Sequence, residues 1–137
     1  MKFAIRDDGR TLTDLDHVRL ARLVQAERSP EASPLAAALD AAQLVPSRKV
    51  DRHVVTMGSQ VLLTDLDMRR TWTLTVCYPE EANVGDGFVS VLSPAGASLI
   101  GRRVGDTAHW RTPRGDAGAA TVLAVTFQPE ASGLYTL

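Results

Sequence analysis

Few residues in this chain of 137 amino acids have the type and spacing that chemistry requires. The three histidines, His17, His53 and His109, lack the short His, Asp or Glu spacings that are typical of metal sites. Cys77 is the single cysteine, which excludes an internal disulfide and a cysteine zinc site within one chain. No basic residue lies next to Cys77 in the sequence to activate its thiol. We therefore expect structural or surface roles for the histidines and an inert thiol.

Two glutamates, Glu27 and Glu31, flank the expected tip of a helical hairpin. Two carboxylates at an exposed tip are able to hold Mg²⁺ together with an outside ligand. Each glutamate lies beside a helix boundary, however, and Pro30 separates them. We expect solvated side chains here, and we predict no catalytic residue, no cofactor and no metal site. Whether the pair has any role stays open.

The basic cluster of the chain combines Arg102 and Arg103 with Arg111 and Arg114. A net charge of -1 gives the chain no overall attraction for nucleic acid. We expect these arginines to form a solvated rim or to contact an anion or a protein partner. Together, the residues that carry chemistry predict a binding module rather than an enzyme.

The elements that position these residues change character near Pro46. Ala and Leu dominate before it, whereas Val, Thr and Gly dominate after it, a change from helix formers to strand formers. Residues 13–28 and 33–45 predict two short antiparallel helices. A capping box marks the start of the first, and Ser-Pro marks the start of the second. The first helix has a second apolar stripe, Leu15, Val18 and Ala26, which predicts cover from two sides.

Four segments after Pro46 predict β-strands, namely 54–63, 71–78, 106–111 and 119–127. Strict alternation over 71–78 is the strongest strand signal, and residues 58–59 are compatible with a bulge. Residues 93–101 predict one short helix that begins at Ser-Pro and ends at Gly. The fold class is therefore α+β, a short helical hairpin followed by an antiparallel sheet with one short helix.

Composition restricts the protein class further. Hydrophobic residues make up 45% and charged residues 23% of the chain, as in ordinary globular proteins. No apolar run approaches the roughly 20 residues that a membrane span needs. The first ten residues lack the apolar core of a secretory signal, so we expect a cytoplasmic protein.

Several blocks of the sequence resemble the C-terminal domain of the bacterial GreA/GreB transcript-cleavage factors. The blocks keep their order over residues 54–127. They are Val-Val-Thr-Met-Gly-Ser-Gln-Val at 54–61, Ser-Val-Leu-Ser-Pro at 90–94, the segment 97–106, and Thr-Pro-x-Gly at 112–115. Residues 11–137 also resemble the Rnk family, the regulators of nucleoside diphosphate kinase. That resemblance rests on residues 11–16, Tyr78-Pro79, residues 104–110 and residues 127–131.

The resemblance implies a short coiled-coil hairpin over residues 1–46 and an FKBP-like domain over residues 47–137. It also implies binding to RNA polymerase near the secondary channel in competition with Gre factors, with no sequence-specific nucleic acid and no membrane as partners. In Gre factors the Ser-Pro segment of the C-terminal domain meets a coiled coil at the rim of the secondary channel of RNA polymerase. Arg102 and Arg103 of this chain would add positive charge to that contact. The expected partner-binding positions are Ser90, Ser93, Pro94, Gly96, Arg102 and Arg103.

The chain departs from the Gre pattern at the tip of its hairpin. In Gre factors a long coiled coil carries an Asp-x-x-Glu tip that holds the catalytic Mg²⁺ of the polymerase. The helices expected here span only about 18–22 Å, and Glu27 and Glu31 do not form that motif. We therefore expect docking without stimulation of transcript cleavage. The alternatives are a Gre-type cleavage factor and, more remotely, an FKBP-type peptidyl-prolyl isomerase; the oligomeric state and the target genes stay open.

Overall fold

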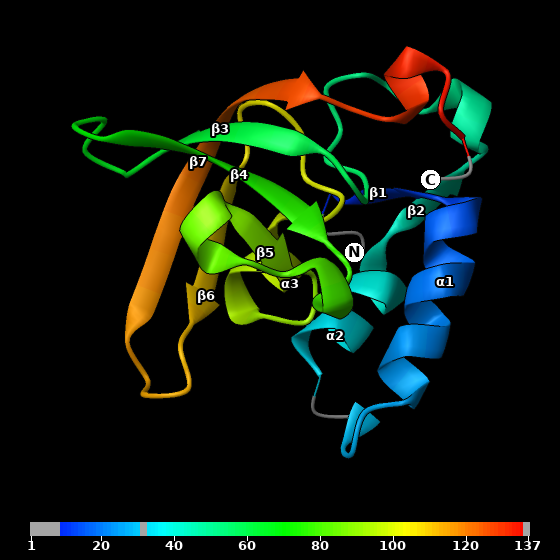
Figure 1. Ribbon diagram of the computed structural model, residues 1–137, viewed down its shortest axis with the longest axis horizontal. Helices are drawn as coiled ribbons and strands as arrows, with labels where there is room; N and C mark the ends of the chain where they lie inside the picture. The colour runs from blue at the N-terminus through cyan, green and yellow to red at the C-terminus, as the bar shows by residue number, and fades with distance from the viewer. Residues whose placement is uncertain (1–8, 31–32, 136–137) are drawn as a thin grey trace, which may run out of the picture.

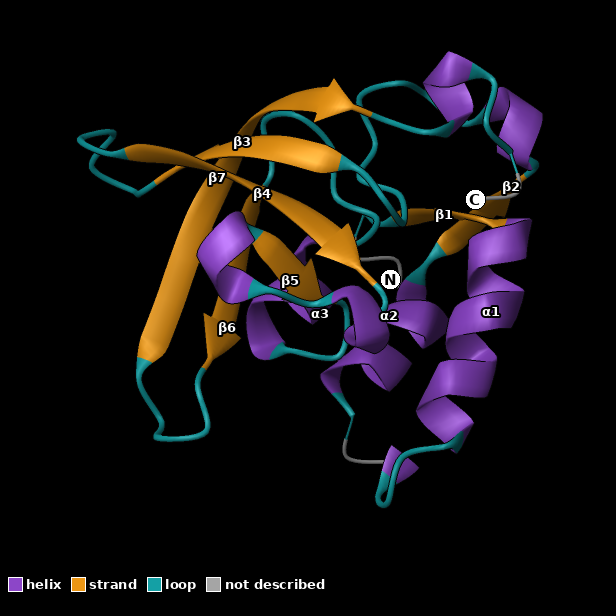
Figure 2. Ribbon diagram, in the orientation of Figure 1, coloured by secondary structure: helices purple, strands orange, loops and turns teal. Residues whose placement is uncertain are grey.

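The structure is a computed structural model that describes residues 9–30 and 33–135. The first half of the described chain runs through β1 Thr11–Thr13, α1 Asp14–Gln25, α2 Pro34–Ala41, β2 Gln43–Val45, η2 Ser47–Lys49, β3 Gln60–Thr64 and β4 Thr71–Cys77. The second half runs through η3 Pro79–Glu81, η4 Val84–Asp86, β5 Phe88–Ser90, α3 Pro94–Leu99, β6 Thr107–Arg111, β7 Ala117–Phe127 and η5 Glu130–Ser132. The fold is α+β, with short helices first and a curled sheet after them (Figures 1 and 2).

The sheet has five strands in the order β5-β4-β3-β7-β6 (Figure 2). Four of them pair antiparallel, but β4 and β5 pair parallel, so the prediction of a wholly antiparallel sheet is wrong at this edge. The reason is the connection: residues 78–87, with the short helices η3 and η4, carry the chain back before β5 begins. A parallel neighbour needs such a crossover, because a tight turn can only reverse the strand.

The first strand of this sheet is shorter than predicted. Strand β3 begins at Gln60, and residues 54–59 approach it as a bridge and a turn. Gly58 has φ +83° at this turn, a conformation that favours glycine, and its N–H donates to the Val76 carbonyl at 2.8 Å. Gly58-Ser59 is therefore a turn before the strand rather than a bulge within it.

Both N-terminal helices form, and both end earlier than predicted. Helix α1 ends at Gln25, and α2 ends at Ala41. Residues 43–45 instead form β2, which pairs parallel with β1 (Figure 1). Pro46 disfavours helical backbone in the residue before it, which leaves Val45 extended and free to pair. Val45 therefore belongs to a strand and not to the apolar stripe of the second helix.

The helices and the sheet share one hydrophobic core. Leu12, Leu20 and Leu35 from the N-terminal elements are fully buried in the same cluster as Val61 and Leu99 from the β-rich part. Each such side chain contributes roughly 1.5–3 kcal/mol when it leaves water. The position of the helices relative to the sheet is therefore fixed by packing.

The second apolar stripe of α1 does not receive the cover that we expected. Val18 at its centre is 50% exposed, and Ala26 at its end is exposed. Leu20 and Val24, on the other stripe, face the core. Leu15 of the same stripe is half-buried, so within the described residues this stripe is partly covered at its start and open from Val18 onward.

Candidate functional site

The Ser90–Pro94 segment forms a tight turn between β5 and α3. The Ser93 hydroxyl donates to the Ser90 carbonyl at 2.7 Å and accepts from the Gly96 N–H at 3.1 Å. The Ser90 hydroxyl accepts from the Leu92 N–H at 3.0 Å. Ser93 is thus the N-cap and Pro94 the first residue of α3, as predicted. These bonds hold a half-buried Ser-Pro surface in one conformation.

Gly96 shapes this turn from the inside. It is buried, and a Cβ placed on it would overlap the carbonyl oxygen of Ser90 and come within 3.0 Å of Val91 Cα. Only glycine lets the helix approach β5 so closely. Of the predicted partner-binding residues, Gly96 therefore serves the shape of the turn and offers no side chain to a partner.

The two predicted arginines lie at the other end of α3. The Arg102 Nε donates to the Ser98 carbonyl at 3.3 Å. Arg103 is exposed, and its Nη2 lies 3.8 Å from Asp51 Oδ2. The structure thus brings Ser90, Ser93 and Pro94 together and separates them from the arginine pair by the length of the helix.

Two of the three histidines are exposed, the third is half-buried, and Cys77 is buried. His53 is exposed and lies 3.1 Å from Asp51, whose pKa is lowered first by a hydrogen bond from the His53 N–H. His109 is exposed on β6 and His17 is half-buried on α1. Cys77 is buried, and burial raises the pKa of its thiol, which disfavours the reactive thiolate.

Just after α1, the structure differs from the prediction that the side chains of Glu27 and Glu31 are solvated. Glu27 is half-buried, and its Oε1 has no hydrogen-bond partner among the described residues. Glu31 lies outside the described residues. In residues 9–30 and 33–135, no group of three or more His, Cys, Asp or Glu side chains lies in a position to hold a metal ion.

The carboxylate of Asp16 lies in the first turn of α1 and is buried, which the sequence did not predict. The Thr13 hydroxyl accepts from the Asp16 N–H at 3.0 Å, which is the first half of the predicted capping box. The Asp16 carboxylate also interacts with the Thr13 side chain, and its Oδ2 accepts from the Met57 N–H at 3.1 Å. Burial raises the pKa of Asp16 to about 6, against the lowering effect of that hydrogen bond, and Glu130 adds repulsion. The capping-box spacing marked this residue but not its partner.

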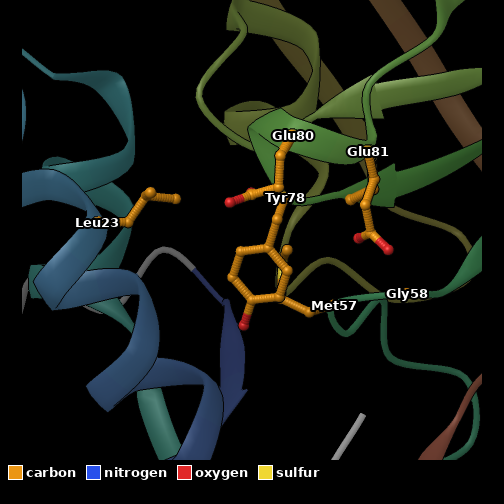
Figure 3. A pocket seen from close by; sticks show the side chains of 7 residues that line it. Leu23, Met57, Gly58, Tyr78, Glu80 and Glu81 are labelled. Carbon is orange, nitrogen blue, oxygen red and sulfur yellow. The ribbon is translucent and has the colours of Figure 1, made fainter.

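A cleft of about 450 Å³ opens between α1 and the end of β4 (Figure 3). Leu23 of α1 forms one wall, Met57 and Gly58 lie opposite, and the Tyr78 ring stands between them (Figure 3). Glu80 and Glu81 of η3 line the same cleft, and Cys77 completes its lining. The walls are mainly apolar, and the charge at the rim is negative. The cleft can therefore hold an apolar group that carries a positive charge.

Comparisons with known proteins agree with this architecture. Residues 50–127 match the family model described as transcription elongation factor GreA/GreB, C-term. The regulator of nucleoside diphosphate kinase of Escherichia coli strain K12 is 37% identical over 129 residues, which cover 92% of this chain and 95% of that protein. GreA of Desulfotalea psychrophila is 36% identical over 77 residues, and the match spans 48% of its length.

A solved structure supports the same relationship. The prokaryotic transcription elongation factor GreA/GreB from Nitrosomonas europaea superimposes with a TM-score of 0.71 at 27% identity. The superposition covers 88% of this chain and 100% of that one. Among the described helices, none has the length and hydrophobicity to cross a membrane. The chain belongs to the GreA/GreB transcription elongation factor family, and over nearly its whole length it is a homologue of the regulator of nucleoside diphosphate kinase.

Proposed function

We propose that this protein is a transcription regulator that binds RNA polymerase at the rim of the secondary channel. There it competes with Gre factors and does not stimulate transcript cleavage. Family membership over residues 50–127 supports the polymerase as partner. The observation that carries the proposal is the Ser90–Pro94 turn, because that segment is the one through which the resemblance implies docking.

The geometry of the turn suits a docking role. Its side chains are fixed by hydrogen bonds within the turn, and Pro94 restricts the backbone. A surface that is ordered before binding loses little conformational entropy when a partner arrives. Arg103 lies at the far end of α3 from the turn, so we expect it to make a peripheral electrostatic contribution to binding. Such a contribution raises the rate of association more than the affinity.

The short helices support docking without cleavage. Helix α1 has 12 residues and α2 has 8, so they span about 18 Å and 12 Å. A carboxylate assists a metal-bound water only when it reaches the metal with correct geometry. Helices of this length keep the hairpin end close to the sheet rather than extending it far into a channel.

Binding to purified RNA polymerase core enzyme tests the proposal directly. We expect saturable binding that added GreA or GreB reduces, and about a five- to tenfold loss of affinity for Pro94→Ala. Pro113→Ala is the matched control, because Pro113 is exposed and lies in the loop between β6 and β7, outside the turn. Ser93→Thr keeps both hydrogen bonds of the cap and tests the surface without removing it. Absence of binding at low salt would refute the proposal.

A Gre-type cleavage factor is the alternative, and the unpartnered Glu27 oxygen at the end of α1 favours testing it. Backtracked elongation complexes with Mg²⁺ provide the assay. We expect no shortening of the transcript when the protein is added. Shortening that disappears with Glu27→Gln would establish the alternative. An isomerase is disfavoured, since Tyr78 is the one aromatic residue among those that line the described cleft.

A further inference from the structure

The cleft between α1 and η3 lies next to the proposed docking turn. Cys77, which lines the cleft, is the register partner of Ser90 in the parallel β4–β5 pair. The Val91 N–H, within the turn, donates to the Cys77 carbonyl at 2.9 Å. Neighbouring strands lie about 4.8 Å apart. A partner that covers the turn therefore comes within side-chain reach of the cleft.

The cleft has an apolar interior and an acidic end. Leu23 and the Tyr78 ring face each other across it, while Glu80 and Glu81 stand at the η3 side (Figure 3). Both glutamates are exposed at the rim, where a partner can contact them. The methylene stem of a long basic side chain suits such walls, and its charged end suits the carboxylates. The face of a tyrosine ring adds attraction for a cation.

The charges around the cleft are consistent with this polarity. Glu81 and Glu80 add to the effect of burial in raising the pKa of the Cys77 thiol. Asp16 and Glu80 add to the effect of burial in raising the pKa of the Tyr78 phenol, which Arg19 opposes. A bound cation is therefore favoured beside Glu80 and Glu81, at the η3 side of the cleft.

We propose that the cleft lined by Leu23, Tyr78, Glu80 and Glu81 receives an arginine or lysine side chain of the partner that docks on the Ser90–Pro94 turn. This inference rests on the proposed function, because it takes RNA polymerase as that partner. It adds a second contact point of defined chemistry to the docking surface.

Two perturbations test the cleft independently, with affinity for RNA polymerase core enzyme as the readout. Glu80→Gln with Glu81→Gln removes both charges and keeps the side-chain size. We expect about tenfold weaker binding and a smaller dependence on salt. Leu23→Trp fills the cleft and leaves the charges in place, and we expect a similar loss. Far-UV circular dichroism and thermal unfolding establish that the variants are folded.

The control is Asp40→Asn with Asp67→Asn, which changes the net charge equally at exposed positions away from the cleft. If this control weakens binding as much as the glutamate pair does, overall charge is responsible and the cleft proposal is wrong. Unchanged binding by the folded Leu23→Trp variant also overturns it. If the wild-type protein itself does not bind the polymerase, the proposed function fails. Wild-type binding with unaffected cleft variants refutes this inference alone.

Discussion

Asp16→Asn is expected to stabilise the fold at neutral pH. Asp16 is only 4% exposed, and burial is the main reason why its pKa rises from 3.8 to about 6. Glu130 adds repulsion, whereas the Met57 N–H, Arg19 and the Thr13 hydroxyl favour the charged form. Asparagine keeps an oxygen that accepts the Met57 N–H and removes the buried charge.

The magnitude follows from the pKa. One pKa unit corresponds to about 1.4 kcal/mol, so a rise from 3.8 to about 6 corresponds to about 3 kcal/mol of destabilisation once Asp16 is ionised. Below about pH 4 the carboxyl is protonated in both states and has no such effect. Between about pH 4 and pH 6 the unfolded chain binds fewer protons than the native one, so stability falls as pH rises. Above about pH 6 the full cost is present.

Urea unfolding of the wild type and of Asp16→Asn between pH 4 and pH 8 measures this effect. The difference in free energy of unfolding should grow from near zero at pH 4 to at most about 3 kcal/mol at pH 7 in favour of the variant. Asp14→Asn, in the same helical turn but exposed, is the control and should not show this growth. A variant less stable than the wild type at pH 7 would refute the reasoning, because the ionised carboxylate would then be net stabilising.

Three further substitutions should each lower the free energy of unfolding by a different amount, which chemical denaturation measures. Gly96→Ala should lower the free energy of unfolding by about 1–3 kcal/mol, because a Cβ at this position has no room. Gly85→Ala should lower it much less, because its Cβ meets only an ordinary contact at 3.5 Å. Equal losses would contradict the packing argument. Ser93→Ala should cost about 1 kcal/mol and Ser93→Thr less, because only alanine removes the helix cap. Thr56→Val should cost about 2 kcal/mol, because the buried Glu130 carboxylate loses a hydrogen bond of 2.6 Å; a neutral result would mean that water replaces it.

Features with local signals were predictable from the sequence. The Ser93-Pro94 start and the Gly101 end of the short helix α3 were both visible, and Gly101 adopts φ +81° just after the helix. Alternation over residues 71–78 located β4, which spans Thr71–Cys77. In each case the sequence signal lies within the element itself or at its ends.

Features set by distant contacts were not predictable. Strands β1 and β2 have three residues each and exist because residues about 32 positions apart meet in a parallel pair. The parallel β5 depends on the path of the crossover from β4, which no local pattern encodes. Likewise, the capping-box spacing identified Asp16, but its hydrogen bond to Met57 joins residues 41 positions apart. The sequence reveals that such a polar group exists, and the fold decides which partner satisfies it.

The same distant contacts determine how the docking turn and the first helix act together. The Thr11 N–H donates to the Gly101 carbonyl at 3.0 Å, and the Arg10 guanidinium donates to the Ala97 carbonyl at 2.6 Å, so the chain leading into α1 is attached to α3. At its other end α3 carries the Ser93-Pro94 cap. Because the core also joins α1 to the sheet, packing and hydrogen bonds fix the turn, the cleft and α1 in position relative to one another. A partner held at the turn therefore meets Leu23 in a fixed place, which is the condition under which the cleft contributes to affinity without an added ordering cost.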